Sequence, residues 1–396
     1  MELSGSNFKM KKFNRPIKVV NIVEEGRVGG PQKRIVLVAS KISKEIDTTV
    51  IIPKENSAEF QTLCKKLNVK YLISPLIPIK RDIFSMFSYL AFFPYEVFKL
   101  SCLLKKNNFD IAHISGGSWQ YKGALAAKLA KVKILWHLND TYVPIFFRIL
   151  FKLISPIANG YIFSAFRAKK YYDKYLNSKK PKFVIAPPVD TTLFNPSKNY
   201  TLKKKKILNQ KKLTVIGTIA NINKIKGLET FIKAGEILNQ NIKNLHFQVI
   251  GKVFENQKKY FNSLENLCKK KKNFNIDFIK NCSDVRPYLK RFDIFTISSL
   301  SETGPMTLWE AMSMEKAIVS TNVGDVSMFL KNNINSYIVD IDDYKKFAKK
   351  INKLITRPRL RRNFGKKVRR IVKNKLDLRI CADLHAKAYR VIVNSD

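Results

Sequence analysis

The segment Ser298–Gly324 carries the residues whose types and spacing best suit chemistry on a ligand. Its sequence is SSLSETGPMTLWEAMSMEKAIVSTNVG, and seven residues separate Glu302 from Glu310. A Gly-Pro pair follows Glu302 closely, and proline is tolerated in the first turn of a helix. We therefore expect a buried strand, then a short turn that holds Glu302, then a helix that holds Glu310 about one turn in.

The start of this helix, at Met306, Thr307 and Leu308, is a candidate anion site. The first backbone N–H groups of a helix have no partner inside it, and the helix dipole places positive charge there. Two carboxylates and a set of amides would then face one crevice. Sugar hydroxyls need acceptors and a diphosphate needs donors, so these groups suit a nucleotide-sugar better than a metal ion, whose carboxylate ligands must converge on one point. Glutamates at this spacing also occur by chance, in which case Glu310 belongs to a solvated helix face.

The elements that position this segment follow a repeated strand–helix order. Ile17–Val23 is a short apolar run ended by a turn, which is typical of a parallel strand covered on both faces. A glycine-bearing loop, Gly26–Gly30, and a helical pattern follow it. Further strands are expected at Thr49–Ile52, Tyr71–Ile73, Ile111–Ile114, Ile134–His137 and Gly160–Ser164. This alternation predicts an α/β fold with a doubly wound parallel sheet.

A second domain of the same kind is expected after a break in the pattern. Residues 197–212 form a polar, lysine-rich stretch, which indicates a linker between domain 1–196 and domain 213–376. In the second domain, strands are expected at Leu213–Gly217, Phe247–Gly251, Ile276–Ile279, Ile294–Ser298 and Ala317–Ser320. A last helical segment, about 377–396, is a candidate to pack back on the first domain. Because ligands of such sheets bind at the carboxyl ends of the strands, two Rossmann-like domains facing a central cleft can hold a two-part substrate.

The full string of the glutamate segment is far more specific than its two glutamates. E-T-G-P-M-T-L-W-E-A-M, followed by K-A-I-V-S-T-N-V-G, resembles the retaining GT-B glycosyltransferases of family 4, whose hallmark is a pair of glutamates with seven residues between them. Other pieces match the family in its order: Gly26–Gly30, Phe109–Gly116, Leu135–Thr141, Ala186–Phe194, Ile216–Gly227 and Asp284–Phe295. The resemblance covers nearly the whole chain, and it implies a GT-B fold and a hexosyltransferase-type reaction that uses a nucleotide-sugar donor.

For the second domain, the resemblance implies roles residue by residue. Glu302 lies against hydroxyls of the donor sugar, and Glu310 holds the ribose hydroxyls of the nucleotide. The turn and helix start that contact sugar and phosphate are Gly304, Pro305, Met306, Thr307 and Leu308. Lys226 pairs with the donor diphosphate, although in a chain so rich in lysine such a residue is otherwise typical of the surface.

For the first domain, the resemblance implies a glycine loop and a histidine. Gly29 and Gly30 lie in the loop where a missing Cβ lets the backbone approach the phosphate or the acceptor. His137 faces the reacting sugar from the end of a strand, whereas a lone histidine there is more often a satisfied core residue. The other histidines are His113, which lies near another strand end, and His246 and His385, for which the sequence indicates no role.

The implied chemistry is transfer with the anomeric configuration retained, in which a phosphate oxygen of the leaving group accepts the proton of the attacking hydroxyl. Lys226 and the helix amides would stabilise the leaving diphosphate, so neither a metal ion nor a cofactor is expected. Thr218 departs from the family, which usually has an arginine there, and Ser327 and Met328 stand where a glutamate is frequent. In the lengthened loop before Lys226, the candidate replacements for the arginine are Asn221, Asn223 and Lys224.

The net charge indicates anionic partners. Lys and Arg number 74 against 30 Asp and Glu, a formal charge of +44, which attracts phosphorylated substrates, anionic lipids or nucleic acid. A bias of AT-rich coding toward lysine explains much of the excess. A nucleic-acid-binding protein is one alternative, based on Lys203–Lys206 and Lys269–Lys272, but little aromatic interleaving accompanies these runs and no nucleic acid is expected. A GT-B-fold nucleotide-sugar epimerase or hydrolase is the other alternative.

Two apolar segments beside cations are candidates for membrane contact. Ile83–Phe98 is shorter than the roughly 20 residues of a spanning helix, and Val143–Phe166 carries Arg148 and Lys152. Such segments are typical of helices in the headgroup region, and the alternative is a buried core helix. The chain start lacks the apolar part of a secretory signal, and the 5 cysteines are scattered. We therefore expect action in the cytoplasm or at the inner membrane face, on a glycan or lipid-linked acceptor of cell-envelope synthesis, while the nucleotide base, sugar and oligomeric state stay open.

Overall fold

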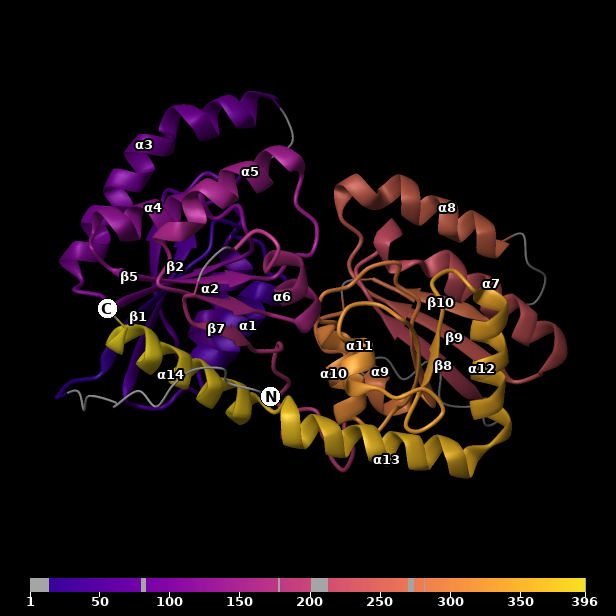
Figure 1. Cartoon of the computed structure of the whole chain (residues 1–396). Helices are drawn as coiled ribbons and strands as arrows, with labels where there is room; N and C mark the ends of the chain where they lie inside the picture. The colour runs from indigo at the N-terminus through magenta and orange to yellow at the C-terminus, as the bar shows by residue number, and fades with distance from the viewer. Residues whose placement is uncertain are drawn as a thin grey trace. The chain divides into compact units, whose positions relative to one another are not determined.

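The computed structural model describes residues 14–79, 83–176, 179–200, 213–269, 274–280 and 282–395, and the chain divides into two compact units. Unit 1 runs from Met1 to Pro188 and resumes from Leu378 to Asp396, and unit 2 is Val189–Asp377 (Figure 1). Most of the expected linker, residues 201–212, lies outside the described residues.

Unit 1 is built on a parallel sheet with the strand order β3-β2-β1-β4-β5-β6-β7 in the described part of the chain. These strands are β1 Ile17–Ile22, β2 Ile46–Pro53, β3 Lys70–Ser74, β4 Ile111–Ser115, β5 Lys133–Leu138, β6 Gly160–Phe163 and β7 Lys182–Val184. Successive strands are joined through helices, and every pairing is parallel. All five residues of β4 are buried, because helices cover both faces of the sheet.

The helices of unit 1 form two layers around this sheet. They are α1 Gly30–Ala39, α2 Ala58–Lys66, α3 Ile83–Lys106, α4 Tyr121–Leu129, α5 Ile145–Ile154, α6 Phe166–Tyr172 and α14 Leu378–Asn394. One face of the sheet packs against α3, α4, α5 and α6, around Trp136 and Phe151. The other face packs against α14, where Tyr389 and Ile392 meet Ile17, Ile111 and Leu135. The helix at the end of the chain therefore completes the core of unit 1.

Unit 2 repeats the architecture, and the strand order of its described residues is β10-β9-β8-β11-β12-β13. Its strands are β8 Thr214–Ile219, β9 Leu245–Ile250, β10 Ile276–Ile279, β11 Ile294–Ile297, β12 Ala317–Thr321 and β13 Tyr337–Val339. Its helices are α7 Leu228–Asn241, α8 Lys258–Lys269, α9 Arg286–Arg291, α10 Met306–Ser313, α11 Val326–Phe329, α12 Tyr344–Thr356 and α13 Pro358–Lys375. The α/β fold with two parallel, Rossmann-like sheets is thereby confirmed.

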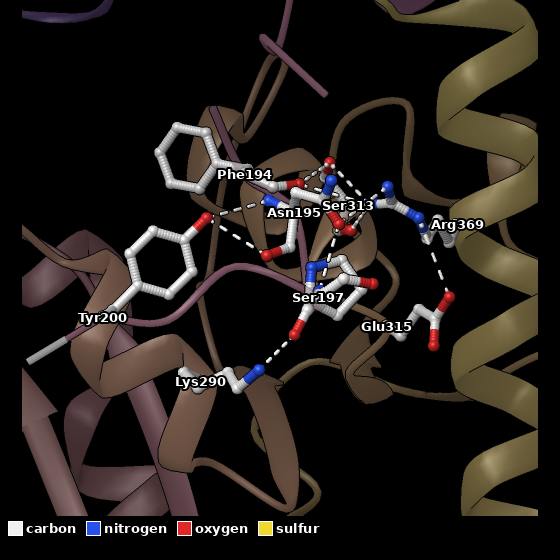
Figure 2. A network of polar contacts seen from close by, with 9 residues as sticks. Phe194, Asn195, Ser197, Tyr200, Lys290, Ser313, Glu315 and Arg369 are labelled. Atoms are coloured by element: carbon white, nitrogen blue, oxygen red, sulfur yellow. Dashed lines mark hydrogen bonds and ion pairs between the residues drawn. The ribbon is translucent and has the colours of Figure 1, made fainter. Parts of the chain in front are cut away.

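The units divide at residue 188, whereas the sequence placed the domain boundary at 196, because the chain after Pro188 is fastened to unit 2. Ser313 Oγ donates a hydrogen bond of 2.6 Å to the carbonyl oxygen of Phe194, and Arg369 Nη1 donates one of 3.2 Å to the same oxygen (Figure 2). Tyr200 Oη accepts from the backbone N–H of Asn195 at 3.1 Å. These bonds hold residues 194–200 on the surface of unit 2.

Helix α3 runs without a break through Pro94. Among the helices of the described ranges, it alone is long and apolar enough to cross a membrane, and 33% of its most apolar window is buried. Glu96, in its second half, is 3% exposed and forms an ion pair with the buried Lys122 of α4. This buried pair fixes α3 to the core of unit 1.

Candidate functional site

The turn that the sequence singled out lies between β11 and α10 of unit 2 and brings Glu302 to Lys226. The Lys226 Nζ donates to Glu302 Oε1 at 2.6 Å, and Ser299 Oγ donates to the same oxygen at 2.8 Å. The side chains of Lys226 and Glu302 are 23% and 13% exposed. A cation and a carboxylate 76 positions apart in the chain therefore meet at the carboxyl edge of the sheet, where both can still reach a ligand.

The backbone holds Lys226 in place as well. Lys226 ends a single 3₁₀ turn, Lys224–Lys226, and its carbonyl oxygen accepts a bond of 3.0 Å from Ser298 Oγ. Gly227 follows with φ +55°, and a Cβ there would lie 2.2 Å from the carbonyl oxygen of Ser298. Only glycine combines this left-handed backbone with such a close approach, so the sequence Lys-Gly is a requirement of the site's geometry.

A second glycine, Gly324, packs against the turn that carries Glu302. Gly324 has φ +52°, and a Cβ there would lie 2.5 Å from the carbonyl oxygen of Thr303 and 2.8 Å from that of Glu302. The backbone N–H of Asp325 donates to the same Thr303 oxygen at 3.2 Å. The last glycine of the motif thus packs directly against the backbone that carries Glu302.

Helix α10 offers fewer free donors than the sequence led us to expect. Pro305 is the N-cap, and its carbonyl oxygen accepts from Leu308 N at 3.0 Å and Trp309 N at 3.4 Å. The amide of Leu308 is therefore already engaged, which corrects its expected role as a free donor, and its side chain is fully buried. Met306 and Thr307 begin the helix, so their N–H groups have no partner within it.

Glu310 shares one face of α10 with Met306, the first residue of the helix. It follows Met306 by four positions, a spacing that places two side chains on one helix face, and both residues are half-buried. Its neighbours Trp309 and Ala311 are buried in the core. Glu310 therefore shares a helix face with Met306, at the start of α10.

The departures from the family pattern lie in the loop after β8. Thr218 is 2% exposed, so it belongs to the core and offers no charge to a ligand. Asn221 and Lys224 are exposed. Asn223 is half-buried, and within the described part of the chain its Oδ1 is a buried atom with no hydrogen-bond partner.

In unit 1, the glycine loop lies at the start of α1. Gly29 is the N-cap, and its N–H donates to Gln32 Oε1 at 3.0 Å, while Gly30 is exposed. The φ of Gly29, −128°, is an ordinary extended value, and a Cβ there would lie 3.3 Å from Gln32 Oε1 and 3.9 Å from Pro31 Cδ. Gln32 is buried and also donates to the carbonyl oxygen of Glu25, so a side chain at Gly29 would require this hydrogen-bonded residue to shift.

His137 ends up fully buried, near the end of β5. Its Nδ1 lies 2.6 Å from Arg34 Nη1 and 3.0 Å from His113 Nε2. Burial and the nearby Arg34 guanidinium lower the pKa of His137 well below its usual range. No sequence pattern connects Arg34 with this histidine, because the two residues are 103 positions apart and on different elements.

A known family matches the part of the chain that holds the groups of unit 2. Residues 199–371 match the model of the family "Glycosyl transferases group 1", a range that contains Lys226, Glu302 and the whole of α10. The chain carries a domain of the glycosyltransferase group 1 family. The matched range covers nearly all of unit 2.

Individual relatives and structures agree with this class. This glycosyltransferase is 29% identical over 168 residues to the Staphylococcus aureus "Capsular polysaccharide biosynthesis glycosyltransferase CapM", covering 42% of this chain and 43% of that relative. It is 24% identical over 267 residues to the Escherichia coli "UDP-Gal:alpha-D-GlcNAc-diphosphoundecaprenol alpha-1,3-galactosyltransferase", covering 64% and 67%. A glycosyltransferase structure from Rickettsia africae matches 97% of this chain and 100% of that chain, with a TM-score of 0.81 and 18% identity, which shows the shared GT-B fold.

Proposed function

We propose that this glycosyltransferase moves a hexose-type sugar from a nucleoside-diphosphate sugar to a lipid-linked or glycan acceptor of cell-envelope polysaccharide synthesis, with the anomeric configuration retained. The observation that carries the proposal is the meeting of Lys226, Glu302 and the free amides of α10 at one sheet edge. The E. coli relative, whose name states a UDP-sugar donor and a diphosphoundecaprenol-linked acceptor, supports both substrate classes.

In this proposal, each group of unit 2 binds a different part of the donor. The amides of Met306 and Thr307 and the Lys226 ammonium take the diphosphate, Glu310 accepts from the ribose hydroxyls, and Glu302 accepts from the sugar. Lys226 then exchanges its bond to Glu302 for one to phosphate. Because the exchange occurs between two partly exposed positions, the cation need not be moved out of a buried pair.

The bond changes balance without a further reactant. The bond between the anomeric carbon and the diphosphate oxygen breaks, the acceptor oxygen bonds to that carbon on the same face, and the acceptor proton passes to the departing phosphate. Negative charge develops on the diphosphate in this step, where Lys226 and the helix amides are aimed, and one such donor is worth about 10²–10³ in rate. Action without a metal ion or cofactor stays a prediction, and unchanged turnover in excess EDTA would support it.

In unit 1, we propose that His137 donates a hydrogen bond to an oxygen of the reacting sugar and that the loop at Gly29 and Gly30 takes the phosphate or the acceptor. The buried Nε2 of His137 has no hydrogen-bond partner in the described part of the chain. A buried polar group without a partner is unfavourable, so an incoming oxygen atom would satisfy it.

The proposal is tested with Glu310→Ala. We expect UDP-sugar turnover to fall at least tenfold through a raised KM, because Glu310 would hold the ribose in both the ground state and the transition state. The matched control is Glu255→Ala, since Glu255 is an exposed glutamate of unit 2 that forms an ion pair with Lys258. Equal turnover of the two variants across a panel of nucleotide-sugars would remove the proposal. Epimer formation without any acceptor would favour the epimerase alternative instead.

We also propose that unit 1 works at an anionic membrane surface, the inner face of the cytoplasmic membrane, through the outer faces of α3 and α5. The exposed apolar residues there are Phe84, Met86, Phe87, Leu90, Phe92, Tyr95 and Phe98 of α3, and Ile145, Phe146, Ile149 and Leu153 of α5. Both helices cover the same face of the sheet, and both carry cations, Lys99 on α3 and Arg148 and Lys152 on α5 (Figure 1). Apolar side chains interleaved with cations are typical of helices that lie in the headgroup region.

A further inference from the structure

Three of the four histidines of the chain gather inside unit 1 with one arginine and one tyrosine. His113 comes from β4, His137 from β5, His385 and Tyr389 from α14, and Arg34 from α1. All five side chains are at most 2% exposed. Residues that are distant in the sequence thus form one buried polar cluster beside the carboxyl ends of β4 and β5.

The histidines of the cluster are neutral at pH 7. Burial and the charge of Arg34 lower the pKa of His113 and His137 well below the usual value, and lower that of His385 to about 3. Burial also lowers the pKa of Arg34, to about 10, so its guanidinium remains protonated. Among the described residues, no carboxylate forms an ion pair with Arg34. Each histidine therefore carries one ring proton, and its position can be deduced from its partners.

The deduction begins at Arg34, which can only donate. Its Nη1 lies 2.6 Å from His137 Nδ1, so this Nδ1 accepts and the proton of His137 is on Nε2. His113 Nε2 lies 3.0 Å from the same Nδ1, and it must therefore donate. His113 Nδ1 is then the acceptor, and Tyr389 Oη donates to it at 2.7 Å.

His385 lies outside this chain of bonds. Its Nδ1 is 2.7 Å from the carbonyl oxygen of Cys381 and therefore donates to it. Its ring lies 6.0 Å from that of His137, with 21° between the planes. His385 therefore packs against His137 without competing for its Nδ1.

We infer that Arg34 and Tyr389 are positioning residues that hold the proton of His137 on Nε2, Arg34 directly and Tyr389 through His113. The inference rests on the proposed function in one respect, the role of His137 toward the sugar. With its Nδ1 occupied by two donors, His137 presents a fixed N–H, and its buried Nε2 has no partner within the described residues. Such a group is suited to an oxygen of the donor and unsuited to removing a proton.

The tautomer is tested by NMR on the free, full-length protein labelled with ¹⁵N-histidine. Four ring systems give a resolvable spectrum, and His246 of unit 2, whose Nε2 pairs with Asp277 at 2.9 Å, serves as an internal reference. We expect Nε2–H tautomers for His137 and His113 in the wild type. In Tyr389→Phe, His113 loses its donor at Nδ1 and should populate the Nδ1–H form. A proton on Nδ1 of His137 in the wild type would overturn the inference.

Kinetics separate positioning from simple packing. We expect Tyr389→Phe to lower kcat about tenfold with donor KM unchanged, the effect of one weakened hydrogen bond in the transition state. The control is Tyr161→Phe, which also removes a buried hydroxyl bond in unit 1, the one of 2.6 Å to the Ser155 carbonyl oxygen, but has no path to His113. Unchanged tautomers and an unchanged kcat in Tyr389→Phe would each contradict the inference.

The arginine variants provide the second test. Arg34→Met removes the donor to His137 Nδ1 and the nearby charge, so the pKa of His137 should rise, although burial still lowers it, while Arg34→Lys should restore the wild-type profile. A His137 titration curve in Arg34→Met identical to that of the wild type would overturn the inference. Because these readouts need no sugar, they hold even if His137→Asn leaves turnover intact, a result that would contradict only the proposed role of His137.

Discussion

Lys226 and Glu302 show how a site can be assembled from residues that are unremarkable one by one. The chain has 74 Lys and Arg residues, and Lys226 differs from the rest through its position after β8, its bond to Glu302 and the glycine that follows. The bond to Glu302 keeps the ammonium oriented when no ligand is present. A partly exposed pair of this kind contributes little to stability, so its purpose is orientation.

We expect Lys226→Met to lower kcat about 10²-fold with little change in stability, because one donor to the leaving diphosphate is lost. The measurement is release of nucleoside diphosphate from the donor, alongside thermal melting. Lys243→Met is the control, since Lys243 is exposed and lies just beyond α7. If the two variants turn over within twofold of each other, Lys226 does not stabilise the leaving group.

At the residue scale, the sequence predicted what a local string can encode. Glu302, Glu310 and the helix start belong to one segment, so their proximity follows from a strand–turn–helix pattern. The prediction that the Leu308 amide is a free donor was wrong, because the bond to the Pro305 carbonyl depends on the local geometry of the first turn. The Arg34–His137–His113–Tyr389 chain could not be predicted, since its members come from four elements and its bonds join residues up to 276 positions apart.

At the scale of elements, the strands were easier to predict than their limits. β2 begins at Ile46, three residues before the predicted start, and β13 has only three residues and was not predicted. Alternation of apolar and polar residues is weak in strands that are buried on both faces, so their ends carry little signal. The long helix α3 continues through Pro94, an exposed position of the helix, although the proline removes one backbone hydrogen bond.

We expect the outer faces of α3 and α5 to bind anionic vesicles. The wild type should sediment with phosphatidylglycerol vesicles and less so with phosphatidylcholine, and salt should weaken the binding, because cations accompany the apolar side chains. Phe87→Ser combined with Phe146→Ser should reduce the bound fraction several-fold. The control is Ile334→Ser, which removes an equally exposed apolar residue of unit 2. Wild-type protein that stays in the supernatant at low salt would contradict the proposal.

Glu24, just after β1, makes the stability of unit 1 depend on pH. Burial raises its pKa from 4.5 to about 7, against the opposing charge of Lys122. The folded protein thus binds the proton more tightly than the unfolded chain, so this group's contribution declines as the pH rises from about 4.5 to about 7. The decline is about 3 kcal/mol by linkage.

In Glu24→Gln this pH-dependent contribution to the free energy of unfolding is absent, because the amide does not titrate. We expect the free energy of unfolding of the wild type to fall by about 3 kcal/mol more than that of Glu24→Gln between pH 4.5 and pH 8, as measured by urea denaturation. Parallel pH profiles for the two proteins would show that Glu24 is ionised in the folded state across this range.

At the scale of the molecule, the defining feature is that unit 1 is built from both ends of the described chain. Helix α14 follows the whole of unit 2 in the sequence and supplies Tyr389 and Ile392 to the core of unit 1. From the sequence, the helical segment at about 377–396 was a candidate to pack back on the first domain. The two parallel sheets were predictable from the repeated strand–helix order.

We expect Ile392→Ala to destabilise unit 1 by about 2–4 kcal/mol, since it opens a cavity at a fully buried position of α14. Urea denaturation with a probe in unit 1, such as Trp136, is the measurement. Lys387→Ala, at an exposed position of the same helix, should stay within about 0.5 kcal/mol of the wild type. Equal loss in both variants would mean that α14 contributes only its helicity.

The late position of α14 has a consequence for how the protein is made. A ribosome releases the seven strands of the first described sheet long before it reaches Leu378, and until then the part of one face around Ile17, Ile111 and Leu135, which α14 covers, is exposed. During synthesis, unit 1 therefore emerges first but completes its folding last. It must avoid aggregation while the nearly two hundred residues of unit 2 emerge and fold. Nascent chains arrested before Leu378 should therefore be the ones that recruit chaperones.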